Sequence, residues 1–148
     1  MAEFTYNPVQ LIAAGASAIF NTSRGCPKGY VLHRNESGIV TLRGIVRNQC
    51  ACSARYQVTF NGNIALPEDA TVGPISVAIS IDGEALQTSN AIVTPAAVDQ
   101  YFNVTSTAII DVPRGCCTRV GVKNTSIGTT TNPAINMQNA NLTITRIA

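Results

Sequence analysis

The 148-residue sequence has no tryptophan and a single histidine, and only 12% of its residues are charged, against roughly 25% in an average soluble protein. Its ten Lys and Arg residues are scattered along the chain and its net charge is +2. It therefore lacks the clustered basic face that contacts nucleic-acid phosphates. Its apolar runs are also shorter than the roughly 18 residues that suggest a membrane-spanning helix. We expect neither nucleic acid nor a membrane as a partner.

Catalytic motifs are absent as well. His33, in "GYVLHRNESG", has no second ligand at a metal-binding spacing, and the nucleophile elbow, the phosphate-binding loop and the dinucleotide glycine pattern do not occur. The close carboxylate pairs, Glu68 with Asp69 and Asp82 with Glu84, fall in predicted turns, where carboxylates commonly accept backbone hydrogen bonds. We expect a protein that is not an enzyme and that uses no cofactor and no metal.

The N-terminal stretch "MAEFTYNPVQLIAAG" contains Glu3 and no Lys or Arg, and the first basic residue is Arg24. A secretory signal peptide has a positively charged segment before its apolar stretch, and this sequence has none. We expect synthesis in a cytoplasm without such a signal.

Apolar and polar residues alternate with period two along most of the chain. In "RYQVTF", Tyr56, Val58 and Phe60 share one face, and "PISVAISIDGEAL" alternates in the same way before Asp82-Gly83, a dipeptide typical of a tight hairpin. We expect eight to ten strands and no amphipathic helix. Turn residues separate them at short intervals, which predicts a single all-β domain, an antiparallel two-sheet sandwich of the jelly-roll type, over residues 15–148. Residues 1–14 form an N-terminal arm or the first strand.

Several stretches of the chain resemble one family of short proteins encoded by gut Firmicutes and their phages, namely "YNPVQ", "GIVTLRG", "ARYQVTFNGNIALP", "TVGPISVAISIDGEAL", "AIVTPAAV", "VPRGCC" and "MQNANLTITRIA". In its general pattern the chain is also similar to the trimeric jelly-roll modules of the tumour-necrosis-factor (TNF) and C1q type found on phage particles and spore surfaces. The resemblance implies a structural protein, exposed on the virion surface and made in the host cytoplasm, that serves as a capsid decoration or head-fibre protein. The alternative is a bacterial cell-surface or spore-coat assembly protein cross-linked through cysteines.

The most distinctive reactive groups in the sequence are five cysteines, Cys26, Cys50, Cys52, Cys116 and Cys117. Structural zinc sites usually use C-x-x-C pairs, and neither Cys-Ala-Cys nor Cys-Cys has that gap. Two interpretations stay open: the cysteines are small apolar core residues, or they form disulfides after release into an oxidising medium. With strands in jelly-roll order, the loops of Cys50 and Cys52 and of Cys116 and Cys117 emerge at the same end. That order favours bonds between these loops or between subunits and leaves Cys26 as the odd thiol.

The closing stretch "NPAINMQNANLTITRIA" predicts an oligomer interface, because its polar residues are uncharged Asn and Thr and unpaired buried charges are costly. In the trimeric modules that the chain resembles, the closing strand lies near the threefold axis. We expect a homotrimer, which binds other virion or surface-layer proteins. The side chains assigned to the interface are Ile135, Met137, Leu142, Ile144 and Ile147. The anchors of a docking arm are Phe4, Tyr6 and Val9, unless this segment is an ordinary first strand.

Overall fold

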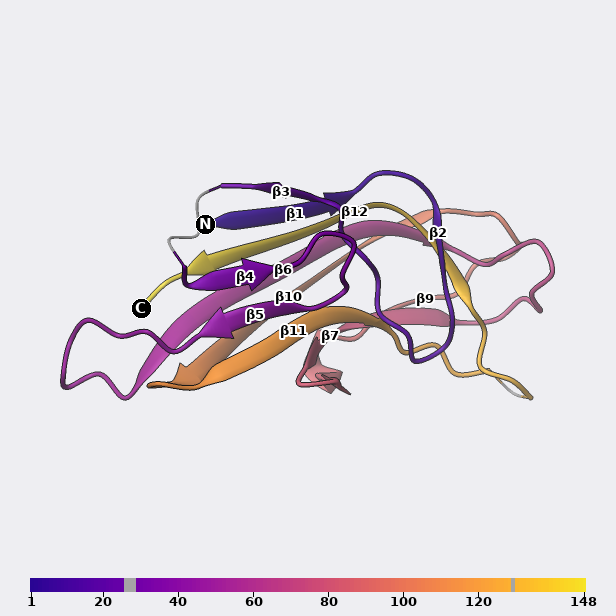
Figure 1. The fold of residues 1–148 in the computed structure, drawn as a ribbon. Helices are drawn as coiled ribbons and strands as arrows, with labels where there is room; N and C mark the ends of the chain where they lie inside the picture. Colours follow the sequence, from indigo (N-terminus) through magenta and orange to yellow (C-terminus); the bar gives the residue numbers. More distant parts are fainter. Residues whose placement is uncertain (26–28, 129) are drawn as a thin grey trace.

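Two antiparallel sheets pack face to face in the computed structural model, which describes residues 1–25, 29–128 and 130–148 (Figure 1). Sheet A consists, in order, of β10 (Phe102–Pro113), β6 (Ser53–Ala65), β12 (Ile135–Arg146), β1 (Ala2–Tyr6) and β3 (Thr22–Arg24), with β2 (Gln10–Ile12) also paired to β12. Sheet B consists, in order, of β4 (Val31–His33), β5 (Val40–Arg43), β11 (Cys117–Asn124), β7 (Ile75–Ile81) and β8 (Glu84–Ala85), with β9 (Ala91–Val93) also paired to β7.

This arrangement confirms the predicted all-β, two-sheet antiparallel sandwich. The helical content of the described residues is one 3₁₀ turn, η1 (Gln87–Ser89), and none of their helices is long and apolar enough to cross a bilayer. The Asp82-Gly83 hairpin is also confirmed, because Ile81 pairs with Glu84 and both turn residues have positive φ, 50° and 90°. The strand count exceeds the prediction because five of the strands are only two or three residues long.

The core lies between the sheets and follows the period-two pattern of the long strands. In β6, Tyr56, Val58 and Phe60 are fully buried, whereas Gln57, between them, is exposed. On β10, Ile110 and its inward neighbours repeat the pattern. Each long strand of sheet A therefore has one apolar face in the core and one polar face outside.

A β-bulge keeps β12 in phase with the core. Met137 and Leu142 are five residues apart, an odd spacing that places them on opposite faces of a regular strand. The register with β6 shifts between Gln138 and Asn141, and Asn139 adopts a φ of 53°. One residue is inserted there, and both Met137 and Leu142 are fully buried.

Burial corrects the predicted interface side chains of β12. Ile135, Met137, Leu142 and Ile144 are fully buried inside one chain, and Ile147, just beyond the strand, is 48% exposed. The four buried side chains are core residues and cannot contact a partner. The outward face of β12 carries uncharged polar residues instead, namely Asn141, Thr143 and Thr145.

The N-terminal segment is a strand and not an extended arm. Residues Ala2–Tyr6 form β1, which pairs with β12 on one side and β3 on the other. Phe4 is buried in the core, Tyr6 is half-buried against it, and Val9 is 48% exposed between β1 and β2. Phe4 therefore stabilises its own domain.

We predict that Ile144→Ala lowers the free energy of unfolding by about 2–5 kcal/mol, because it leaves a cavity between the sheets. Thr143→Ala, one residue away on the outward face, costs about 1 kcal/mol or less. Urea unfolding of both variants at one protein concentration measures the difference. Equal losses for the two variants would contradict the assignment of Ile144 to the core.

Candidate functional site

The outward side chains of three adjacent strands of sheet A, the edge strand β10 and its neighbours β6 and β12, form a polar surface, which we call the open face. They are ordered in rows by the strand register, so that Thr107, Thr59 and Thr143 lie side by side across β10, β6 and β12. The polar residues that alternate with apolar ones in "RYQVTFNGN" indicate this surface in the sequence, but their pattern alone assigns it no role. The open face consists of Arg55, Gln57, Thr59, Asn61, Asn63, Asn103, Thr105, Thr107, Ile109, Asp111, Asn141, Thr143 and Thr145.

Hydrogen bonds between neighbouring strands hold the side chains of the open face in place. Asn61 Nδ2 donates to Thr105 Oγ1 at 3.0 Å, and Asn103 Nδ2 donates to Asn61 Oδ1 at 3.0 Å. The hydroxyls of Thr59 and Thr107 are 3.2 Å apart. Because these groups are already ordered, a partner that contacts them loses less side-chain entropy on binding.

The charges on the open face compensate each other at one end of it. Arg55 Nε lies 2.7 Å from Asp111 Oδ1, and Arg55 Nη2 lies 2.8 Å from Oδ2, so the pair is bidentate. The hydrogen bond from Arg55 lowers the pKa of Asp111 below its usual range, and the same bond raises the pKa of Arg55. Beside this pair, Ile109 is 54% exposed. The other side chains of the open face are uncharged, and at its border Glu3 of β1 accepts a 2.6 Å hydrogen bond from Asn141 Nδ2.

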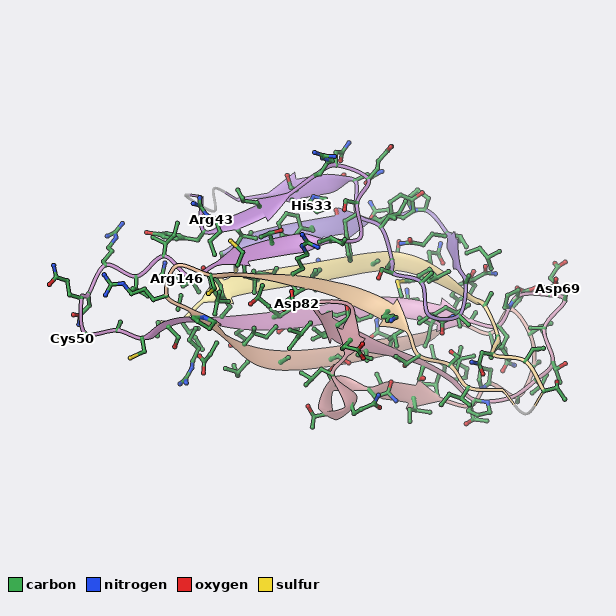
Figure 2. All side chains as sticks on the ribbon, turned by 60° about the horizontal axis from the view of Figure 1, so that its bottom comes forward. His33, Arg43, Cys50, Asp69, Asp82 and Arg146 are labelled. Atoms are coloured by element: carbon green, nitrogen blue, oxygen red, sulfur yellow. The ribbon has the colours of Figure 1, made fainter. Side chains whose placement is uncertain are left out.

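The two cysteine-bearing loops lie side by side at one end of the sandwich, as their predicted positions in a jelly roll require. The Gly44 amide donates to Cys116 O at 2.8 Å, and the Gly115 amide donates to Gly44 O at 3.0 Å. The Arg114 amide donates to Cys52 O at 2.9 Å. Figure 2 shows Cys50 at this end, which we call the cysteine end, and Asp69 at the opposite end.

The described cysteines are surface residues. Cys50, Cys52, Cys116 and Cys117 carry free, exposed thiols, so the interpretation as apolar core residues is wrong for these four. Cys26 lies outside the described residues. Disulfide bonding, within the chain or between subunits, stays a prediction.

The side chains considered for catalysis or metal binding have structural contacts. His33 Nε2 lies 2.9 Å from Ser37 O, and the imidazole packs 4.8 Å from the Phe4 ring centroid. Asp82 Oδ1 accepts a 2.9 Å hydrogen bond from the Arg119 amide beside the β7–β8 turn. Within residues 1–25, 29–128 and 130–148, no three His, Cys, Asp or Glu side chains group closely enough to hold a metal ion.

Two tyrosines and an arginine cover the core at the cysteine end. The Tyr56 hydroxyl donates to Arg43 O at 2.6 Å, and burial raises the pKa of this phenol. The guanidinium carbon of Arg146 lies 4.4 Å from the centroid of the Tyr30 ring, in a cation–π contact. Arg43 and Arg146 both lie toward this end in Figure 2.

Comparison with solved structures identifies the fold. The chain is similar to the globular domain of zebrafish complement 1qA protein, with 12% identity over 99% of this chain and 97% of that chain and a TM-score of 0.61. It is also similar to the TNF protein Eiger from S. frugiperda, with 13% identity over 100% of this chain and 92% of that chain and a TM-score of 0.63. The fold is the C1q and TNF jelly roll. No protein-family model and no curated protein matches the chain, and at these identities the structural likeness shows the C1q/TNF-like fold alone.

We predict that oxidation with glutathione disulfide links the two loops of the cysteine end. Their backbones are hydrogen-bonded to each other, so the two loops that carry the exposed thiols are adjacent. Trypsin then releases residues 48–55, with Cys50 and Cys52, joined to residues 115–119, with Cys116 and Cys117, which non-reducing mass spectrometry detects. A double variant, Cys50→Ser with Cys52→Ser, is the control and gives no such product. Five alkylatable thiols in the oxidised protein would contradict the prediction.

We predict that the ion pair between Arg55 and Asp111 contributes to acid sensitivity. Because the pKa of Asp111 is lowered in the folded chain, the unfolded chain binds the proton more readily, and the stabilising effect is lost as pH falls below about 4. Asp111→Asn therefore has a shallower loss of stability over this range in urea unfolding. Asp69→Asn, at the opposite end, is the control. Identical pH profiles for wild type and Asp111→Asn would contradict the role of the pair.

Proposed function

We propose that this chain is a non-enzymatic structural protein that assembles as a homotrimer through the open face of sheet A. The assembled module is displayed on the surface of a bacteriophage particle, as a capsid decoration or head-fibre protein. The observation that carries the proposal is the open face itself, which has regular hydrogen-bonded rows and one compensated ion pair.

The chemistry of the open face suits contact with a second copy. The cores of protein interfaces are depleted of charged residues, because each unpaired charge is costly to remove from water. The outward face of sheet B is different, since β5 and β11 place Arg43, Arg119 and Lys123 there. Because its two charged residues, Arg55 and Asp111, compensate each other, the open face has a lower cost of desolvation than the cationic surface of β5 and β11.

Closed cyclic symmetry buries the same face of every subunit and leaves no unpaired end. Three copies are proposed from the resemblance to trimeric jelly-roll modules. The trimeric jelly-roll modules that the sequence resembles assemble in this way around their closing strand. Here the closing strand is β12, in the middle of sheet A, and its outward residue Thr143 lies in the central row of the open face.

The particle surface is proposed from the sequence motifs and from the cysteine end. Four exposed thiols at one end of the module leave it ready for cross-linking once it leaves a reducing cytoplasm. The same feature favours the second candidate, a bacterial cell-surface or spore-coat protein. Flanking capsid and portal genes would support the phage assignment, and flanking sporulation genes would overturn it.

We predict that Thr59→Glu weakens trimer association by about 100-fold or more, because each subunit then brings a carboxylate to the centre of the interface, where like charges cost several kcal/mol. Thr41→Glu, on the outward face of β5 in sheet B, is the matched control and leaves the trimer intact. Sedimentation equilibrium measures both association constants. A monomeric wild type, or a Thr59→Glu variant that remains trimeric, would refute the proposed assembly.

A further inference from the structure

The end of the sandwich opposite the cysteine end, which we call the acidic end, carries carboxylates that the proposed assembly does not use. Two of its loops, residues 66–74 and 94–101, contain no Lys or Arg. The Asp99 amide donates to Leu66 O at 2.9 Å, which holds these two loops together. The exposed carboxylates of the acidic end are those of Glu68, Asp69 and Asp99.

A cavity of about 420 Å³ opens at the acidic end, between the loop of residues 66–74 and the segment that precedes β12. Its apolar walls are open to solvent, since Val72 is 50% exposed and Ile127 is 75% exposed. Among the described residues that line it, Asp69 is the only charged one. A side chain that fits this cavity therefore combines an apolar stem with a cationic head, as arginine does. Three prolines complete the apolar walls, namely Pro67, Pro74 and Pro133.

The loop between β5 and β6 supplies such a side chain at the cysteine end. Residues 44–52 project beyond both sheets (Figure 1), and Arg47 is exposed on this loop. Arg114 Nη1 donates to Gln49 O at 2.9 Å, which braces the loop against the turn between β10 and β11. The one ion pair among the described residues lies on the open face. Within those residues, neither Arg47 nor any carboxylate of the acidic end therefore has an ionic partner.

We propose that the β5–β6 loop of one copy docks into the acidic-end cavity of the next copy, where Arg47 packs along Ile127 and pairs with Asp69. The partner is a second copy because one chain carries both complementary surfaces, and Figure 2 shows Cys50 of this loop and Asp69 at opposite ends. Such a head-to-tail contact uses different surfaces on the two copies, so each copy keeps one free end and a row grows. Neither the loop nor the cavity contains an open-face residue. The contact therefore goes beyond the proposed trimer and does not depend on it.

Methyl NMR at increasing protein concentration tests the contact, with a reductant present so that disulfides do not contribute. The methyl resonances of Val72 and Ile127 report on the cavity, and Ile39, 50% exposed in the turn between β4 and β5, is the control. We expect saturable shifts of the cavity resonances with a dissociation constant of about 1 mM or tighter. Because the paired charges are exposed, about 0.5 M sodium chloride weakens the association at least about fivefold. Cavity resonances that do not change with concentration, or that change no more than Ile39, would overturn the proposal.

The Thr59→Glu variant separates this contact from the open-face assembly. It disrupts the open face and leaves both ends unchanged, so we expect it to retain the concentration-dependent shifts of Val72 and Ile127. A loss of these shifts in Thr59→Glu would overturn the independence of the two contacts and with it this proposal.

A charge exchange identifies the two residues that pair. We expect Arg47→Glu and Asp69→Arg each to weaken the association at least about tenfold, because like charges then meet. The double variant restores opposite charges and associates at least about threefold more tightly than either single variant. Arg34→Glu, the same charge change in the exposed turn between β4 and β5, is the matched control and leaves the affinity within about twofold. A double variant no tighter than the single variants, or an Arg34→Glu variant as weak as Arg47→Glu, would overturn the proposal.

Discussion

The pairing of β12 with β6 in the centre of sheet A is the contact on which the rest of the structure depends. β6 joins β12 to β10, and the other edge of β12 holds β1 and β2, so every other strand of sheet A except β3 contacts one of these two directly. Their inward side chains, Phe60, Leu142 and Ile144 among them, are fully buried against sheet B. β12 pairs with β6 on both sides of the bulge at Asn139, and the inserted residue keeps the apolar side chains of both segments directed into the core.

The same pairing creates the surface that we assign to assembly. Because the side-chain period of a strand is two, every apolar residue directed to the core is followed by one directed outward. In sheet A the outward residues are mostly Asn and Thr, which hydrogen-bond across strands instead of carrying charge. A face of this kind has little to repel another copy of itself. The polar rows and the core are thus two consequences of one register.

The sequence predicts the fold class well and the face assignments less well, for physical reasons. Strands β6 and β10 are long and alternate clearly between buried and exposed residues, and the Asp82-Gly83 turn requires positive φ, so the sequence predicts these elements. The buried face of β12 is harder to predict, because uncharged Asn and Thr occur both in interfaces and on solvent-exposed surfaces. The bulge also interrupts the alternation of apolar and polar residues. The short edge strands contain too few residues to show a period. The contact between Asn61 and Asn103 joins positions 42 residues apart, and only the folded register reveals it.

The most direct test of the assembly compares two isoleucines by hydroxyl-radical footprinting. Ile109 lies on the open face and is 54% exposed in the single chain, whereas Ile92, on β9 of sheet B, is 63% exposed. If copies of the chain cover the open face, Ile109 is oxidised at least about fivefold more slowly than Ile92 in the native protein, because the interface excludes water. Similar oxidation rates for the two side chains would contradict the account.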